Sequence, residues 1–70
     1  MSAPSSISSR IKRARLSAGL TGRQLAAEAG LSAVTISRIE RGHSTPTVAT
    51  LQALSEALGV SLASLTGDAP

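Results

Sequence analysis

The cationic side chains of this sequence are gathered in one part of the chain, which indicates a polyanion as partner. All seven Lys and Arg residues lie within residues 1–42, and two Glu in the same stretch leave a local net charge of +5. Residues 43–70 contain one Glu and one Asp and carry −2. A basic end typically faces nucleic acid, whereas an apolar, nearly neutral end typically packs or self-associates. Taken alone, Arg10, Lys12 and Arg13 are as well explained by a solvated helix face.

The other polar side chains do not form the sets that catalysis or metal binding requires. The chain has no Cys and a single His, His43, so neither a thiolate site nor a His cluster for zinc or iron can be assembled. No paired carboxylates, no nucleophile with a neighbouring base and no phosphate-binding glycine loop are found. We therefore expect no catalytic site, no metal and no cofactor.

Neither a membrane span nor a secretory signal is predicted. The apolar stretches are only a few residues long, and the Ser- and Pro-rich start of the chain lacks an apolar segment. The sequence therefore predicts no membrane partner and a cytoplasmic protein, associated with the nucleoid if its partner is DNA.

Start and stop signals divide the chain into five predicted helices without strands. Ser or Thr N-caps and C-terminal glycines bound these helices, and Gln24 completes a capping box with Thr21. The predicted helices span residues 7–18, 22–29 and 33–41, then 48–58 and a short fifth after Ser61. A flexible arm (1–6) and a flexible tail (67–70) are predicted to flank one all-α domain, residues 7–66.

The predicted core is made of small aliphatic side chains. The chain is 41% hydrophobic but contains no Phe, Tyr or Trp. In 70 residues such a core is thin, so dimerisation would add stability. In the fourth predicted helix, one apolar face is formed by Val48, Leu51, Leu54 and Leu58.

The second and third predicted helices have the spacing of a helix-turn-helix. Ala26 is small where two crossing helices would approach each other, and Gly30 allows a left-handed turn between them. The crossing is expected to be held by Leu25, Leu31, Ile36 and Ile39. A short helix held in this way can project its N-terminal half into a DNA major groove.

Short motifs along most of the chain carry a family resemblance. They are Gly19-Leu20-Thr21, Gln24-Leu25-Ala26, Ala29-Gly30-Leu31-Ser32, Ile36-Ser37-Arg38-Ile39-Glu40-Arg41-Gly42, Pro46-Thr47 and Leu58-Gly59-Val60-Ser61. With these motifs the chain resembles the Cro/CI phage-repressor (XRE-type) family of helix-turn-helix regulators. The resemblance implies a five-helix, lambda-repressor-like domain whose third helix reads DNA. It also implies sequence-specific binding of double-stranded DNA for transcriptional regulation, as a two-fold homodimer on a palindromic operator.

The resemblance places the base-reading positions around the start of the third helix. They are Ser32 at the N-cap, then Ala33, Val34, Ser37 and Arg38. Arg38 can bond guanine O6 and N7 together, whereas Ala33 and Val34 offer only apolar contact, as to a thymine methyl. Ser37 is permissive, and for Arg38 a phosphate contact or a solvated charge is the alternative.

Phosphate contacts are expected on both sides of the third helix. They are assigned to the start of the second helix, at Thr21, Gly22 and Arg23, and to the loop after the third, at Arg41, His43, Ser44 and Thr45. The family commonly carries Gln or another polar side chain where this sequence has Gly22. A contact there would therefore come from the backbone N–H or pass to Arg23, and His43 is equally consistent with a plain loop residue.

Two further roles do not involve DNA. The resemblance implies that Arg15 and Glu40 form an internal ion pair between the first helix and the end of the third. The dimer hypothesis itself assigns the dimer surface to the fifth helix and the end of the fourth, including Leu62 and Leu65.

Two alternatives stay open. The chain is also consistent with the DNA-reading domain of a longer regulator, because the tail resembles the start of a linker. It is further consistent with a protein-interaction module, antitoxin-like or adaptor, that binds an acidic protein. Absence of duplex binding at low salt would favour that module.

Overall fold

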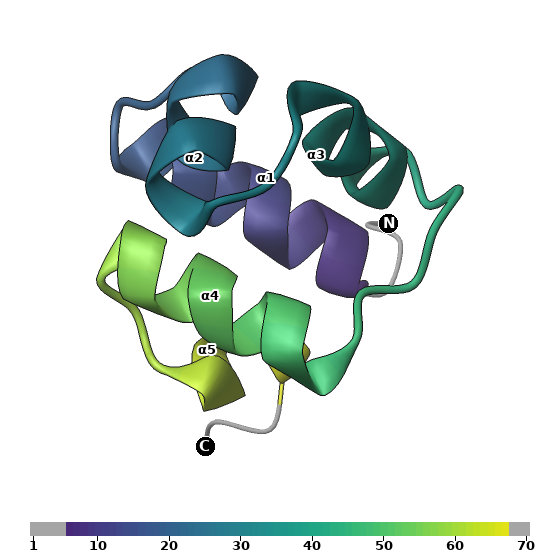
Figure 1. The fold of residues 1–70 in the computed structure, drawn as a ribbon. Coiled ribbons are helices and arrows are strands. Elements are labelled where there is room, and N and C mark those ends of the chain that lie inside the picture. The colour runs from purple at the N-terminus through teal and green to yellow at the C-terminus, as the bar shows by residue number, and fades with distance from the viewer. Residues whose placement is uncertain (1–5, 68–70) are drawn as a thin grey trace.

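The computed structural model describes residues 6–67, which form five α-helices and no β-strand. They are α1 (Ile7–Ser17), α2 (Gly22–Ala29), α3 (Ala33–Glu40), α4 (Val48–Leu58) and α5 (Leu62–Thr66) (Figure 1). The predicted all-α, five-helix fold is confirmed. The predictions of an arm and a tail fall largely outside the described residues, since 1–5 and 68–70 are not described.

A hydroxyl side chain begins each of these helices. In every case its oxygen accepts a hydrogen bond from the backbone N–H three residues later; the N-caps are Ser6, Thr21, Ser32, Thr47 and Ser61. Each such bond satisfies one of the N–H groups that a helix N-terminus leaves without an intrahelical partner. The N-caps predicted at Thr21, Ser32 and Ser61 and the capping box of α2 are confirmed.

The boundaries of the predicted arm and tail are wrong by one residue each. Ser6 caps α1, because its Oγ accepts from Ser9 N at 3.2 Å. Gly67 is the left-handed C-cap of α5, and its N–H donates to Ala63 O. Both residues therefore belong to helix ends.

Two helices also end one residue earlier than predicted. Ala18 and Arg41 are C-caps rather than helical residues, although their backbone angles are still close to helical. The next residues, Gly19 and Gly42, have φ of +73° and +76° and turn the chain out of the helix. Glycine adopts this left-handed conformation without the steric penalty of a Cβ.

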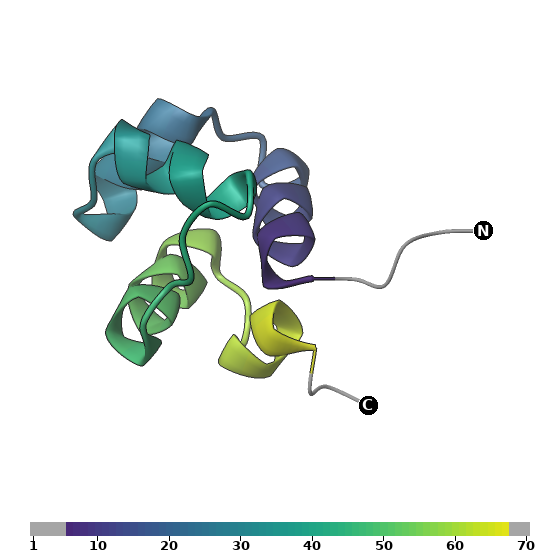
Figure 2. The same cartoon turned by 90° about the vertical axis from the view of Figure 1, so that its right-hand side faces the viewer.

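The core lies where α1 meets α3, α4 and α5, and where α2 packs against α3 and α4 (Figure 1). In Figure 2, α3 lies above α4 on the left of the view, and α1 and α5 lie on the right. The buried side chains are Ile11, Leu25, Ala26, Ile36, Ile39, Leu51, Leu54, Leu58 and Leu65. Leu31 packs against this cluster, so the predicted crossing contacts of the helix-turn-helix are confirmed.

Val48 does not belong to the apolar face predicted for the fourth helix. Its side chain is 65% exposed, whereas Leu51, Leu54 and Leu58 are buried. Val48 is the first residue of α4, where the chain enters from the loop at the edge of the fold (Figure 1). Helical spacing places Val48 on the same face as these leucines, but at the start of the helix its side chain is left uncovered.

Leu54 and Val48 offer a matched test of this packing. Leu54→Ala is expected to lower the free energy of unfolding by about 2–5 kcal/mol, because it opens a cavity in a core without aromatic side chains. Val48→Ala should change it by less than about 0.5 kcal/mol. Urea or thermal unfolding followed by circular dichroism measures both. Similar losses for the two variants would contradict the burial pattern.

Candidate nucleic-acid interface

The helix α3 is buried along one side and exposed along the other. Ile36 and Ile39 are 1% and 2% exposed and anchor the helix in the core. The predicted base-reading side chains after the cap lie on the opposite side and are all exposed: Ala33, Val34, Ser37 and Arg38. Val34 is 68% exposed although it is apolar, and nothing in the fold of the monomer requires a valine there.

Ser32 has a structural duty at the start of α3. Its Oγ accepts from Thr35 N at 3.1 Å and lies 2.8 Å from Thr35 Oγ1. The side chain is exposed, and it directly precedes the other predicted reading positions in the chain. Its hydroxyl is nevertheless engaged by the cap, which gives it less freedom to read a base than Ser37 has.

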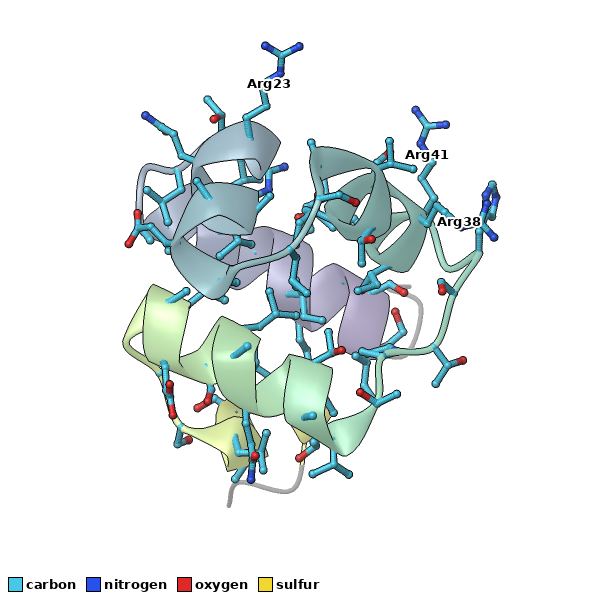
Figure 3. All side chains as sticks on the ribbon, viewed as in Figure 1. Arg23, Arg38 and Arg41 are labelled. Atoms are coloured by element: carbon cyan, nitrogen blue, oxygen red, sulfur yellow. The ribbon has the colours of Figure 1, made fainter. Side chains whose placement is uncertain are left out.

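The start of α2 lies next to α3 and presents the predicted phosphate-binding group. Thr21 N donates to Gln24 Oε1 at 2.9 Å, and Gln24 N donates to Thr21 Oγ1 at 3.1 Å. This capping box uses the Thr21 N–H but leaves its hydroxyl proton available. The N–H groups of Gly22 and Arg23 open the helix and have no intrahelical partner. The Arg23 side chain points away from the molecule (Figure 3).

The loop after α3 supplies the second predicted phosphate-binding group. Arg41, His43, Ser44 and Thr45 are all exposed. The loop is tied to α3 by backbone bonds, since His43 N donates to Arg38 O at 2.9 Å. Figure 3 shows Arg41 pointing toward the top of the molecule, as Arg23 does, and Arg38 projecting at the right-hand edge from this end of α3. The predicted residues of both groups are therefore accessible.

A hollow of about 430 Å³ separates the start of α2 from α3. Its lining comes from three helices and includes Lys12, Arg15, Thr21, Gly22, Arg23, Ala33, Ile36, Ser37, Glu40 and Arg41. Sequence reasoning missed Lys12 as a member of this surface. The available signal is its position three residues before Arg15, because residues at this spacing share a helix face.

The ion pair predicted between Arg15 and Glu40 is confirmed. Arg15 Nε donates to Glu40 Oε2 at 2.7 Å and Nη2 donates to Oε1 at 3.0 Å, which makes the pair bidentate. Nη1 also donates to Leu20 O at 2.9 Å, so Arg15 joins α1, the α1–α2 turn and the end of α3. The hydrogen bond to Glu40 raises the pKa of Arg15, although burial acts in the opposite direction.

Arg10 is separated from the other cations of α1. A Cβ placed at Gly67 would lie 2.9 Å from Arg10 Nε, so the guanidinium rests directly against the C-terminal end of α5. A cation at this end of a helix is favoured by the helix dipole. Arg13 is exposed and does not line the hollow. Arg10, Lys12 and Arg13 therefore lie in three different environments: against α5, at the hollow, and in solvent.

Leu65 is wrongly predicted as part of a dimer surface. Its side chain is 1% exposed and lies in the core. The apolar residues of so short a helix are needed to seal the monomer, which is why Leu65 is not available to a second copy. Leu62 is partly buried and packs against the same core.

Two other structural properties concern residues 6–67. No helix in this range is long and apolar enough to cross a membrane. No three His, Cys, Asp or Glu side chains in the range come together in a way that could hold a metal ion.

Sequence comparisons find regulators with the same motif. A family model described as helix-turn-helix matches residues 11–65. An uncharacterized HTH-type transcriptional regulator of Sinorhizobium fredii, y4dJ, is 44% identical over 55 residues, which cover 79% of this chain and 71% of that protein.

Structural comparisons find the same fold in the P22 c2 repressor. The solution structure of its DNA-binding domain has a TM-score of 0.85 and 32% identity, and covers 96% of this chain and 90% of that one. The crystal structure of the repressor in complex with the synthetic operator 9T has a TM-score of 0.82 and 32% identity, and covers 89% and 94%.

The ion pair can be tested by removing its cation. The two side chains are 14% and 10% exposed. Arg15→Ala should therefore lower the free energy of unfolding by about 1–3 kcal/mol, somewhat less than the roughly 3–5 kcal/mol of a fully buried pair. Arg13→Ala, which removes an exposed cation of the same helix, is the control and should leave the melting temperature nearly unchanged. Unchanged melting of Arg15→Ala together with weaker DNA binding would show that Arg15 contacts DNA instead.

Proposed function

Because this chain belongs to the Cro/CI-type helix-turn-helix family of DNA-binding transcriptional regulators, we propose that it recognises a two-fold symmetric operator as a homodimer, with α3 reading bases in the major groove. The family and its structural relatives are regulators rather than enzymes. The proposal concerns the mode of recognition and the residues that carry it.

The observation that carries the proposal is the exposed side of α3. Its buried side is fixed by Ile36 and Ile39, so the exposed side is presented on a rigid support. Rigid presentation matters because a base contact requires side chains to be held in register with the groove. The P22 c2 repressor, which shares this fold, has been crystallised with a synthetic operator, and this supports DNA binding by the same fold here.

The chemistry of the exposed side chains limits what can be read. Arg38 is suited to a bidentate contact with guanine, and Ala33 and Val34 to apolar contact with thymine methyl groups. Ser37 can donate to or accept from several bases, and Ser32 mainly holds the helix start. We therefore propose an operator half-site in which guanine lies near Arg38 and thymine lies near Val34.

Backbone contacts on both sides of α3 would fix the register. We propose that the Thr21 hydroxyl, the N–H groups of Gly22 and Arg23, and the Arg23 side chain contact phosphates on one side. On the other side, the contacts are assigned to Arg41, His43, Ser44 and Thr45. All of these residues are exposed except Gly22, which is partly buried, and both groups adjoin the reading helix, as phosphate contacts require. Binding of this kind would associate the protein with the nucleoid.

We propose the homodimer because a two-fold symmetric protein matches a palindromic operator, and not because the surface shows an apolar patch. Two copies on a palindrome place their reading helices about 34 Å apart, one turn of DNA. Leu62, partly buried on α5, is retained as a proposed dimer contact, whereas Leu65 is occupied by the core.

Selection of bound sites from a random duplex library tests the proposal. We expect inverted repeats whose half-site centres lie about 10–10.5 base pairs apart, or a multiple of that spacing. Binding to random duplex should weaken with salt, with a log–log slope of about −0.9 per phosphate contacted. Enrichment of single, unrepeated sites would contradict the dimer. A complete lack of duplex binding at low salt would contradict DNA recognition and favour an acidic protein partner.

Arg38→Ala tests base reading by α3. On the selected site we expect a loss of about 1–3 kcal/mol in binding free energy per half-site, because each bound copy loses one bidentate base contact. On random duplex the loss should be much smaller, and the selected base opposite Arg38 should become less strict. Fluorescence anisotropy with both duplexes measures the difference, with Arg13→Ala as the control. Equal losses on both duplexes would make Arg38 a phosphate contact.

A further inference from the structure

Lys12 lies where α1 approaches the reading helix. It follows Ile11, which is fully buried, and is itself exposed. Its side chain lines the hollow between the start of α2 and α3, together with Arg23 and Arg41. Three cations from three separate elements therefore surround one concave surface.

The charge of the hollow is not balanced by the protein. Glu40 is the one carboxylate among its lining residues, and both Glu40 oxygens accept hydrogen bonds from Arg15. That bidentate pair neutralises the acidic group, so Lys12, Arg23 and Arg41 keep an uncompensated positive charge around the opening. Concave basic surfaces with low-dielectric walls concentrate negative charge more strongly than flat ones.

The floor of the hollow is left open at Gly22. A Cβ built at this position would meet only Ile36 Cγ2, at 3.9 Å, so the space beside the first turn of α2 is not filled by protein. A phosphate group can therefore approach the N–H groups of this turn closely, and a long side chain from α1 can reach the same group from the other wall.

We propose that the Lys12 side chain contacts the DNA backbone, where it holds a phosphate seated in the hollow. The inference rests on the proposed DNA binding and adds α1 to the two segments, the start of α2 and the loop after α3, that position the reading helix. Lys12 contacts phosphate only, so its contribution is independent of base sequence and depends strongly on salt.

The neighbouring cation Arg13 provides the control. Arg13 is also exposed and lies on the same helix, but it does not line the hollow. Lys12→Gln and Arg13→Gln each remove one charge and keep a good helix former. A general effect of net charge would weaken binding equally in both, whereas a local contact would weaken it only in the first. Lys12→Arg keeps the charge and serves as the conservative variant.

The experiment measures affinity for a duplex between about 0.05 and 0.3 M salt. For each bound copy of the chain, Lys12→Gln should reduce the log–log salt slope by about 0.9 and weaken binding roughly eightfold at 0.1 M salt, on selected and random duplex alike. Arg13→Gln and Lys12→Arg should keep the wild-type slope. All variants should melt at the wild-type temperature, which separates a lost contact from a lost fold.

The outcomes distinguish this inference from the function on which it rests. If the wild-type chain binds no duplex, the proposed function fails. If the wild-type chain binds and Lys12→Gln keeps its salt slope, or if Arg13→Gln loses as much slope as Lys12→Gln, only the role of Lys12 is overturned.

Discussion

An eight-residue helix has no independent stability in water, and the interface depends on how α3 overcomes this constraint. Isolated helices shorter than about 12–15 residues are marginal because nucleation is costly. In α3 the missing stability comes from Ile36 and Ile39, which are buried in the core where α3 packs against α1 and α2, and from the Ser32 cap. The exposed side of α3 contributes little to folding, so its residues are free to vary with the DNA that is read.

The Arg15–Glu40 pair adds a second constraint at the other end of α3. It joins the last helical residue to α1 and, through Leu20 O, to the turn before α2. Three segments beside the proposed DNA interface are thus connected by one guanidinium. The pair also shows that charges near an interface need not contact the partner, because Arg15 is occupied by the protein and Arg10 rests against α5.

Most of the fold could be predicted from the sequence because its local signals agree with one another. Hydroxyl N-caps and left-handed glycines bound the helices, and the structure departs from the predicted ends by one residue. The errors arise where a neighbour decides burial. Helical spacing assigns Val48 and Leu65 to faces, but only the arrangement of α4 and α5 determines that Val48 is open and Leu65 covered. Lys12 was missed because a charge run alone does not reveal which of its members meets another helix; only its spacing from Arg15 indicates the shared face.

At Gly22, a substitution that raises stability would also fill space at the proposed DNA interface. Its backbone does not need the left-handed region, and a methyl group would fit beside Ile36. Alanine at this position would therefore favour α2 by about 0.5–1 kcal/mol, so optimisation for heat resistance would tend to discard the glycine. The same methyl group would narrow the space beside the first turn of α2. A more robust variant obtained in this way would close part of the opening in which we propose that a phosphate is seated.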